Sequence, residues 1–347
     1  MQEHIPYIHR CFQLAKNGEY TARPNPMVGS VIAFKGKIIG EGWHHKPGEP
    51  HAEVMAINSV ADQLLLPHST LYVNLEPCSH FGRTPPCSLL ILEKGIPKVV
   101  ISNTDPNPLV CGKGVQMLRE HGVEVITGVE SSLGYEINKH FFTFHTQKRP
   151  YVYLKWAESL DRFIAPINQP VNKPFIISSK QSLRLAHRLR AGTQSILIGS
   201  ETALKDNPSL TTRLVKGPDP LKLVIDRYRK LPESLNIFRT PAPAIRIVDS
   251  RFAKEEDIAI QMDKDWNWLG ALLDQLYKKG VQSLQVEGGT RVLSAFIAKN
   301  LWDEIWLIKS HTRLFDGIPA PPIDGVWSYF ESSFYSDSDL VLCFKKK

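Results

Sequence analysis

The first third of the chain contains a histidine, a glutamate and two cysteines, the residue types that form a catalytic zinc site. Glu53 stands two residues after His51, and Cys78 and Cys87 follow further along the chain. One imidazole and two thiolates occupy three positions of a tetrahedral Zn²⁺ and leave the fourth to water. The metal lowers the pKa of that water towards neutrality, so a nucleophile is available at pH 7. Glu53 is well placed to move protons beside the metal.

The order of these residues matches the signature of zinc nucleobase deaminases, in which His-x-Glu precedes Pro-Cys and the glutamate is the general acid/base. Two alternatives stay open. A zinc ion with a fourth protein ligand would only shape the fold of a scaffold protein. A nucleic-acid deaminase with a basic accessory domain would explain His51, Glu53 and the net positive charge. However, such deaminases keep two residues between the cysteines, whereas eight residues separate Cys78 from Cys87.

Hydrophobic periodicity in the first half predicts a layered α/β domain that positions these residues. We expect helices over 3–17, 52–60, 86–93 and 112–121, and strands over 28–34, 37–43, 71–75, 98–102 and 123–127. His51 and Cys87 then stand at helix N-termini, where the helix dipole favours thiolate over thiol. Cys78 is expected at the end of a strand.

Residues 138–150 are expected to link this domain to a second α/β domain. Its predicted strands span 151–156, 195–198, 221–226, 244–248, 283–287 and 304–308, and its predicted helices span 182–189, 268–279 and 289–298. Two polar loops follow strands of this half, at Glu287-Gly288-Gly289 and at residues 199–213. Because ligands of α/β sheets gather at the carboxyl ends of strands, Arg190 and Arg213 are candidates for clamping a phosphate.

Length, composition and charge agree with a two-domain enzyme. The chain has 347 residues, which suggests about two domains of ~150 residues each. An apolar content of 42% argues against disorder, and the five cysteines, an odd number, argue for a reducing compartment. No signal peptide or membrane-spanning apolar run is recognisable, so we expect a cytoplasmic protein. The net charge of +7 comes from scattered basic residues, which favours small anionic ligands over nucleic acid.

Both halves resemble the bifunctional deaminase–reductases of riboflavin biosynthesis, over nearly the whole chain. Matching segments in the first half are 24–29, 42–44, 50–53, 76–87, 105–108 and 112–114, and in the second half 154–155, 159–161, 206–213 and 287–289. The long segment between Cys78 and Cys87 is the family's distinguishing mark. The resemblance implies an N-terminal cytidine-deaminase-like three-layer zinc domain over 1–146 and a C-terminal dihydrofolate-reductase-like α/β domain over 147–347.

The resemblance further implies two successive reactions. The zinc domain would hydrolytically remove the 2-amino group of 2,5-diamino-6-(5-phosphoribosylamino)pyrimidin-4-one, with Glu53 carrying protons to the departing ammonia. The second domain would then use NADPH to reduce the ribosyl side chain to ribityl. The expected cofactors are one Zn²⁺ per chain and NADPH. The expected partners are the phosphorylated pyrimidine and further copies of the chain in a dimer or tetramer, with no nucleic acid and no membrane.

The family's site positions carry over to this chain residue by residue. The zinc ligands would be His51, Cys78 and Cys87. The pyrimidine pocket of the deaminase would include Asn25, His44, Glu76, His80 and Arg83. The substrate of the reductase would meet Lys155, Arg190, Leu210, Arg213 and Glu287. The nucleotide cofactor would meet Ala157, Thr202, Asp206, Gly289, Thr290, Arg291, Val292, Leu293, Ser294 and Ala295. Arg227, which follows a predicted strand, would meet a 2′-phosphate and favour NADPH over NADH.

Three residues of the second half depart from the family's pattern. Arg162 replaces the glycine of Ser-Leu-Asp-Gly, Glu158 replaces a small residue, and Ile176 stands near the place of a usual tryptophan. Arg162 lacks the backbone freedom of glycine. A carboxylate at position 158 would repel a cofactor phosphate unless it points to solvent. A deaminase with a weakened reductase half is therefore an alternative to the fully bifunctional enzyme.

Overall fold

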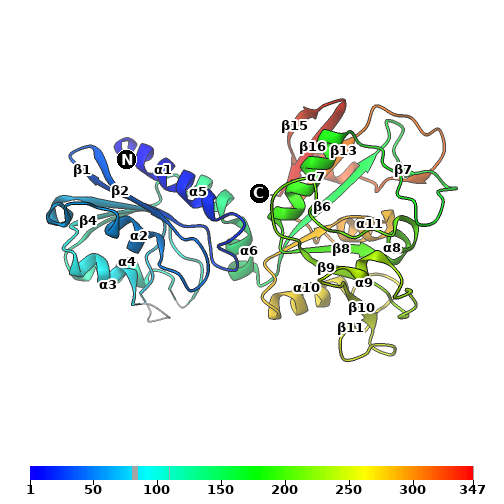
Figure 1. Ribbon diagram of the computed structural model, residues 1–347, viewed down its shortest axis with the longest axis horizontal. Helices are drawn as coiled ribbons and strands as arrows, with labels where there is room; N and C mark the ends of the chain where they lie inside the picture. The colour runs from blue at the N-terminus through cyan, green and yellow to red at the C-terminus, as the bar shows by residue number, and fades with distance from the viewer. Residues whose placement is uncertain (80–84, 109, 347) are drawn as a thin grey trace. The chain divides into compact units, whose positions relative to one another are not determined.

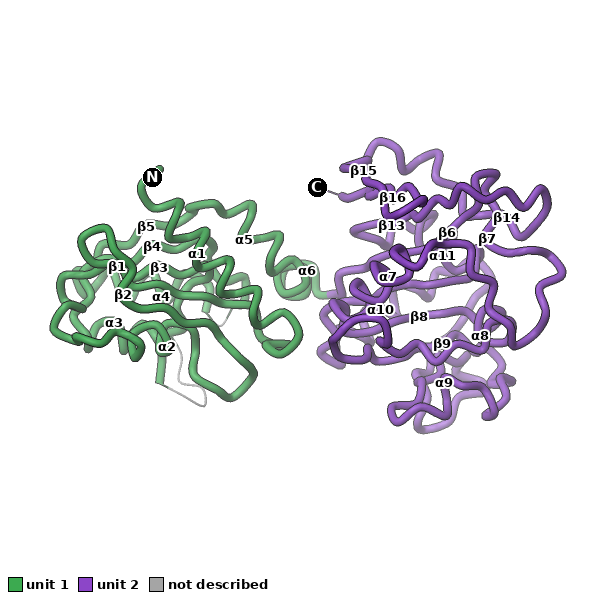
Figure 2. Tube along the Cα trace, turned by 45° about the horizontal axis from the view of Figure 1, so that its top comes forward, with its two compact units in different colours: residues 1–148 green, residues 149–347 purple. Residues whose placement is uncertain are grey.

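The chain folds into two compact α/β units, Met1–Lys148 and Arg149–Lys347 (Figure 2). The structure is a computed structural model that describes residues 1–79, 85–108 and 110–346. Each unit has its own sheet and its own hydrophobic core, so each is considered separately. The α/β class expected from the sequence is confirmed.

The first unit is a five-stranded sheet between two layers of helices (Figure 1). Its strands are β1 (Gly29–Phe34), β2 (Lys37–Trp43), β3 (Thr70–Leu75), β4 (Lys98–Asn103) and β5 (Glu124–Thr127). Its helices are α1 (Ile5–Ala15), α2 (Ala52–Asn58), α3 (Cys87–Glu93), α4 (Lys113–Glu120), α5 (Ser131–Ile137) and α6 (Lys139–Gln147), with short 3₁₀ turns at 2–4, 16–18 and 63–68. The sheet order is β2-β1-β3-β4-β5, in which β3, β4 and β5 run parallel.

Alternating side chains of the strands build both layers of this unit. Val31 and Tyr72 point to the face that α1 covers, whereas Ile32 and Val73 point to the face that α2, α3 and α4 cover. A period of two sends successive side chains to opposite faces of a sheet, and here both faces are apolar and buried. The result is the three-layer arrangement that holds the carboxyl end of β3 beside the start of α2 and α3.

Glycines of β2 allow α2 to lie unusually close to the sheet. A Cβ atom on Gly42 would stand 2.5 Å from the Ala56 nitrogen and 2.5 Å from the Met55 Cβ. A Cβ on Gly40 would stand 2.5 Å from the Ala56 oxygen. Any larger residue at these positions must push α2 away from the sheet, and α2 begins directly after His51.

The second unit is built on a nine-stranded sheet in the order β11-β10-β9-β8-β12-β6-β13-β16-β15. The strands are β6 (Tyr151–Glu158), β7 (Phe163–Ala165), β8 (Ser195–Gly199), β9 (Leu221–Ile225), β10 (Ile245–Asp249), β11 (Ile258–Ile260), β12 (Ser283–Val286), β13 (Glu304–Lys309), β14 (Ile318–Pro319), β15 (Phe330–Ser336) and β16 (Asp339–Lys345). The helices are α7 (Lys180–Gly192), α8 (Ser200–Asp206), α9 (Asn236–Arg239), α10 (Leu269–Lys278) and α11 (Thr290–Ala298), with a 3₁₀ turn at 324–329. β7 and β14 form a separate pair.

Seven neighbouring strands of the large sheet, from β11 to β13, run parallel. Their carboxyl ends therefore lie along one edge, which is where α/β sheets bind ligands. The main core forms where α10 and α11 pack on one face, and α7, α8 and α9 cover parts of the other. β16 and β15 extend the sheet in antiparallel fashion beyond β13.

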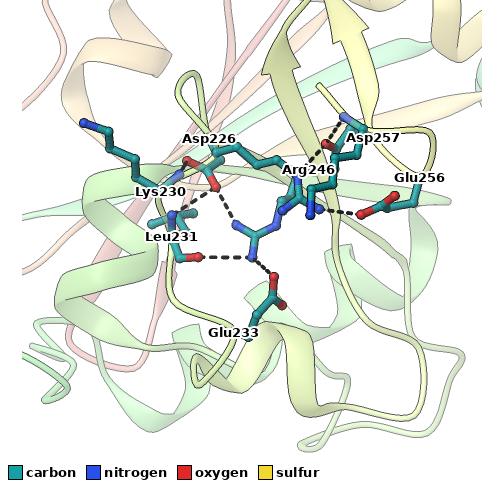
Figure 3. Close-up of polar contacts among 9 residues, drawn as sticks. Asp226, Lys230, Leu231, Glu233, Arg246, Glu256 and Asp257 are labelled. Carbon is teal, nitrogen blue, oxygen red and sulfur yellow. Dashed lines mark hydrogen bonds and ion pairs between the residues drawn. The ribbon is translucent and has the colours of Figure 1, made fainter. Parts of the chain in front are cut away.

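A network of charges, with Asp226 and Arg246 buried at its centre, holds the turn that follows β9 (Figure 3). The Asp226 carboxylate accepts backbone hydrogen bonds from Lys230 at 2.8 Å and Leu231 at 3.1 Å, and it pairs with the Arg246 guanidinium. Arg246 also donates to Glu233 at 2.7 Å. A buried ion pair is stable only when further hydrogen bonds satisfy its remaining polar atoms, and the backbone of this turn provides them.

Every helix and strand expected in either half is present, with ends shifted by a few residues. One expectation about a loop was wrong: the supposed polar loop at 199–213 begins with α8. The segment 138–150, expected to link the two domains, contains α6, which buries Phe141 and Phe142. In the described part of the chain, no helix is both long and apolar enough to cross a membrane.

We predict that Gly42→Ala destabilises the first unit by about 1–3 kcal/mol, the usual cost of overpacking. The added methyl group would collide with the backbone of α2. Urea denaturation followed by circular dichroism measures the change. Gly270→Ala is the control because a Cβ there meets nothing within 4 Å, and its unfolding free energy should stay equal or rise slightly. Equal stability of Gly42→Ala and the wild type would contradict the close packing of α2.

Candidate active sites of the two units

Three side chains of the first unit bring their ligand atoms together at the start of two helices. His51 is the N-cap of α2, Cys87 is the first residue of α3, and Cys78 follows β3. His51 Nδ1 lies 3.5 Å from Cys78 Sγ and 3.3 Å from Cys87 Sγ, and all three ligand atoms lie within 4.8 Å of one another. A tetrahedral zinc separates nitrogen and sulfur ligands by about 3.5 Å. The three residues therefore fit zinc, and among the described residues no fourth ligand joins the group.

Electrostatics at this cluster favour a thiolate at Cys78 at neutral pH, whereas the hydrogen bond with Cys78 and burial raise the pKa of Cys87. Hydrogen bonds from Cys87 lower the pKa of Cys78 to about 4, against the effect of burial. The Cys87 backbone N–H also donates to Cys78 Sγ at 3.3 Å. The hydrogen bond with Cys78 raises the pKa of His51 to about 9, so a proton competes with a metal ion for Nδ1.

Glu53 lies in the first turn of α2 and is only 3% exposed. Burial raises the pKa of its carboxyl group to about 7, although the nearby His51 opposes this shift. A general acid/base works best when its pKa lies near the working pH, because it can then both take and give a proton. Position and pKa together suit Glu53 to proton transfer beside the metal ligands.

Asn25 and His44 form a hydrogen-bonded pair next to the ligands. His44 Nδ1 lies 3.2 Å from the Pro50 carbonyl oxygen, which can only accept, so Nδ1 carries the proton. Nε2 then accepts from the Asn25 amide nitrogen at 2.9 Å. This chain of bonds leaves the Asn25 oxygen as an acceptor for a substrate N–H group. The His44 ring meets the His51 ring edge-on at 5.5 Å.

The other residues expected in the pocket of the first unit are Glu76, His80 and Arg83. Glu76 is buried, and its carboxylate oxygens accept hydrogen bonds from backbone N–H groups of residues 105–115. His80 and Arg83 lie outside the described residues. Asp105, for which the sequence suggested no role, is buried beside Glu76, and desolvation raises its pKa to about 6.

The second unit gathers a cluster of charges at the carboxyl ends of its parallel strands. Arg190 on α7 pairs with Glu287 at 2.8 Å and donates to the Thr211 carbonyl oxygen at 2.8 Å. Although Glu287 is buried, Arg190 and Lys155 hold the pKa of its carboxyl group below its usual value. Burial lowers the pKa of Lys155 on β6, against the effect of Glu287. Three of the expected substrate residues therefore form one electrostatic group.

His187 extends this cluster and was missed in the sequence. It lies one turn before Arg190 on α7, and its Nδ1 accepts the backbone N–H of Arg213 at 3.0 Å. Burial and the neighbouring arginines lower its pKa to about 4. Leu210 is buried with a positive φ of 51°, whereas the Arg213 side chain is exposed and donates to Thr211 Oγ1 at 2.7 Å. The helical spacing from Arg190 was the available signal for His187.

The expected cofactor residues lie around the starts of α8 and α11. Thr202 is on α8, and a Cβ on Gly288 would stand 3.0 Å from its Cγ2 atom. Gly288 and Gly289 have φ of +125° and +73°, which glycine adopts most readily. The run from Thr290 to Ala295 forms the first turns of α11. The two glycines carry no side chain that would block a ligand, and the first N–H groups of a helix such as α11 have no partners within the helix and can donate to a ligand. This arrangement fits the phosphates of a dinucleotide.

Other expected cofactor residues lie further along these strand ends. Ala157 is half-buried near the end of β6. Asp206 accepts a hydrogen bond from Gln169 at 2.6 Å, and burial raises its pKa. Arg227 follows β9, where two of its nitrogens donate to the carbonyl oxygens of Met262 and Asp263. Its contact with a 2′-phosphate stays a prediction.

The three departures from the family's pattern have clear structural settings. Arg162 has a φ of 68°, so this arginine adopts the left-handed conformation for which glycine is usual. Glu158 does not point to solvent: it is 1% exposed and accepts a hydrogen bond from Trp156 Nε1 at 3.0 Å. Burial raises the pKa of Glu158. Ile176 is 60% exposed.

We predict that His187 makes the stability of the protein depend on pH. Its pKa is about 4 in the folded state and about 6.5 when unfolded. The unfolded state therefore binds an extra proton below pH 6.5, and stability falls as the pH drops from 6.5 to 4. Urea midpoints of wild type and His187→Gln should converge above pH 7. Between pH 6.5 and 4, the urea midpoint should fall less in the variant than in the wild type. Parallel pH profiles would contradict this role.

Comparisons with known proteins agree with both clusters. Residues 1–103 match the family model "Cytidine and deoxycytidylate deaminase zinc-binding region", and residues 150–310 match "RibD C-terminal domain". The chain is 40% identical to riboflavin biosynthesis protein RibD of Aquifex aeolicus, over 98% of both chains.

Two solved structures cover the whole of this chain and 99% of their own. One is a diaminohydroxyphosphoribosylaminopyrimidine deaminase/5-amino-6-(5-phosphoribosylamino)uracil reductase from Thermotoga maritima, with 34% identity and a TM-score of 0.87. The other is Acinetobacter baumannii RibD, with 30% identity and a TM-score of 0.88. The expected family, enzyme class and cofactors, zinc and NADPH, are thereby confirmed. The chain belongs to the RibD family of bifunctional deaminase–reductases in riboflavin biosynthesis.

Proposed function

We propose that each reaction of this family is performed by one unit of the chain. The first unit removes the 2-amino group of the phosphoribosylated diaminopyrimidine, and the second reduces the ribosyl chain of the product with NADPH. The observation that supports this division most strongly is the metal cluster with Glu53 beside it, which lies wholly within the first unit.

In the first unit, His51, Cys78 and Cys87 would hold the zinc ion, which would supply an activated water at neutral pH. Glu53 would accept a proton as the water oxygen bonds to the ring carbon, and would donate it to the amino group as the C–N bond breaks and ammonia leaves. A carboxyl group with a pKa of about 7 can perform both transfers. The Asn25 oxygen, oriented by His44, accepts a hydrogen bond from the pyrimidine.

In the second unit, the charge cluster binds and orients the phosphorylated sugar chain. NADPH supplies the hydride. Arg190 and Lys155 offer the positive charges for the substrate, and Glu287 keeps Arg190 in one orientation through their ion pair. The backbone N–H groups at Gly289 and the first turn of α11 bind cofactor phosphate, and Thr202 borders this position.

Arg162 supports a second candidate, in which the reductase works below the rate of its relatives. An arginine at φ 68° costs about 1–2 kcal/mol relative to ordinary backbone. Neighbouring hydrogen bonds offset this cost: the Phe163 N–H donates to Ser159 Oγ at 2.9 Å, and the Arg162 side chain donates to the Pro321 carbonyl oxygen at 3.2 Å. These hydrogen bonds hold the turn in place, so we favour the fully bifunctional enzyme.

We further propose a cytoplasmic homo-oligomer, dimeric or tetrameric. All five cysteines are free, which suits a reducing compartment. The edge strand β15 exposes aromatic side chains, including Phe330 at 46% and Tyr335 at 77%. Exposed apolar edges of this kind are commonly covered by a further chain.

Glu53→Gln should abolish ammonia release and leave both zinc binding and the reductase intact. The amide keeps the shape of the side chain but cannot move protons. Ammonia and NADPH oxidation are measured with the diaminopyrimidine substrate and, separately, with its deaminated product. The variant should oxidise NADPH only when the deaminated product is supplied. Ammonia release at the wild-type rate would exclude Glu53 as the proton carrier.

Arg190→Lys should lower kcat/KM of the reductase by about 10–100-fold, which corresponds to one charge-assisted hydrogen bond of about 1.5–3 kcal/mol. Lysine keeps the charge but cannot bond Glu287 and the Thr211 oxygen in the same geometry. Ammonia release should not change. Arg188→Lys is the matched control, because Arg188 is an exposed residue of the same helix. An equal fall in reductase kcat/KM in both variants would show that Arg190 has no specific role in the substrate site.

A further inference from the structure

The carboxylate of Glu76 has all of its acceptor positions filled by backbone N–H groups. One oxygen accepts from Gly114 at 3.0 Å and Val115 at 3.1 Å, and the other from Asp105 at 3.1 Å and Gly112 at 3.0 Å. A carboxylate offers about four lone-pair sites. Glu76 is 4% exposed. It therefore has no acceptor left for a pyrimidine, although the resemblance placed it in the substrate pocket.

The four donors belong to one structural feature, the loop after β4 and the first turn of α4. The first N–H groups of a helix lack partners within the helix, and α4 begins at Lys113. A negative charge is also favourable at this positive end of the helix. Glu76, which directly follows β3, thus caps α4 and holds the backbone N–H of Asp105.

The same contact brings α4 against the chain next to a metal ligand. A Cβ on Gly114 would stand 2.1 Å from the Pro77 carbonyl oxygen, so only glycine allows this approach. Pro77 directly precedes Cys78. The Cys78 carbonyl oxygen is held in turn by Ser88, whose hydroxyl donates to it at 3.0 Å and contacts Met117 of α4 at 3.2 Å. The backbone around Cys78 is therefore held by the close packing of Gly114 against Pro77 and by the hydrogen bond from Ser88.

We infer that Glu76 is a positioning residue that clamps the Cys78 backbone, Asp105 and Gly112 to the start of α4. This inference rests on the proposed deaminase function of the first unit. It assigns Glu76 to the geometry of the metal site rather than to contact with the pyrimidine. Groups that orient metal ligands typically change metal affinity or activity by about 10–100-fold when they are replaced.

Glu76→Gln tests the clamp in the full-length zinc enzyme. The amide nitrogen would face two N–H donors, so one pair of hydrogen bonds must break. We expect zinc affinity, measured by competition with a chromophoric chelator, and kcat for ammonia release to fall by about 10–100-fold. Hydrogen exchange should accelerate at the amides of Asp105, Gly112, Gly114 and Val115. The visible spectrum of the Co²⁺-substituted protein should also change.

Glu120→Gln is the matched control, since Glu120 is an exposed residue of α4, and it should match the wild type in every measurement. Reductase activity on the deaminated product checks that the chain has folded. Gly114→Ala disrupts the same contact from α4 and should reproduce the fall in zinc affinity and kcat if Glu76→Gln does not fold.

A raised KM for the pyrimidine with unchanged zinc affinity and amide exchange would mean that Glu76 binds substrate, and the inference would be wrong. A wild-type protein that releases no ammonia would overturn the proposed function instead, whatever the exchange data show.

Discussion

The first unit is organised by the need to bring three ligand atoms within 4.8 Å of one another from separate segments of chain. His51 lies 27 residues from Cys78 and 36 from Cys87. The sheet solves this problem because β1 pairs with both β2 and β3, which places the helix after β2 beside the end of β3. The close approach of α2 to the sheet at Gly42 then fixes how near His51, the N-cap of α2, lies to the sheet. Packing of the unit and chemistry of the metal thus depend on the same contacts.

The second unit meets a different constraint, since it must keep several charges at one buried edge. Arg190 and Glu287 are each about one-tenth exposed, and neither would be stable there without the other. Lys155 lies on β6 and Glu287 directly follows the neighbouring parallel strand β12, and α7 adds Arg190 and His187. Near β9, the Asp226–Arg246 network solves the same problem for a turn (Figure 3). In both places, hydrogen bonds from backbone or side chains complete the ion pair.

Much of the metal site could be predicted from sequence because its information is local. His51 and Glu53 share one turn of helix, and the ligand types limit the choice of metal. The partners of Glu76 could not be predicted, since they are backbone N–H groups 29 to 39 residues away that any sequence would carry. α6 was missed although Asn138 stands at its N-cap, because the Asn138 side chain bonds Met27 rather than the helix. β15 was missed because both of its faces are exposed and show no apolar alternation. Such features arise from tertiary contacts rather than local pattern.

Three buried glutamates show how surroundings decide what a carboxylate does. Glu53 receives little compensation for burial, so its pKa rises to about 7 and it can exchange protons. Glu287 faces Arg190 and Lys155, which keep it charged as a partner for cations. Glu76 faces four N–H groups, so its oxygens are occupied by backbone and it can only hold structure. The role of each follows from its surroundings: burial dominates for the proton carrier, cations surround the carboxylate of the binding site, and backbone amides surround that of the clamp.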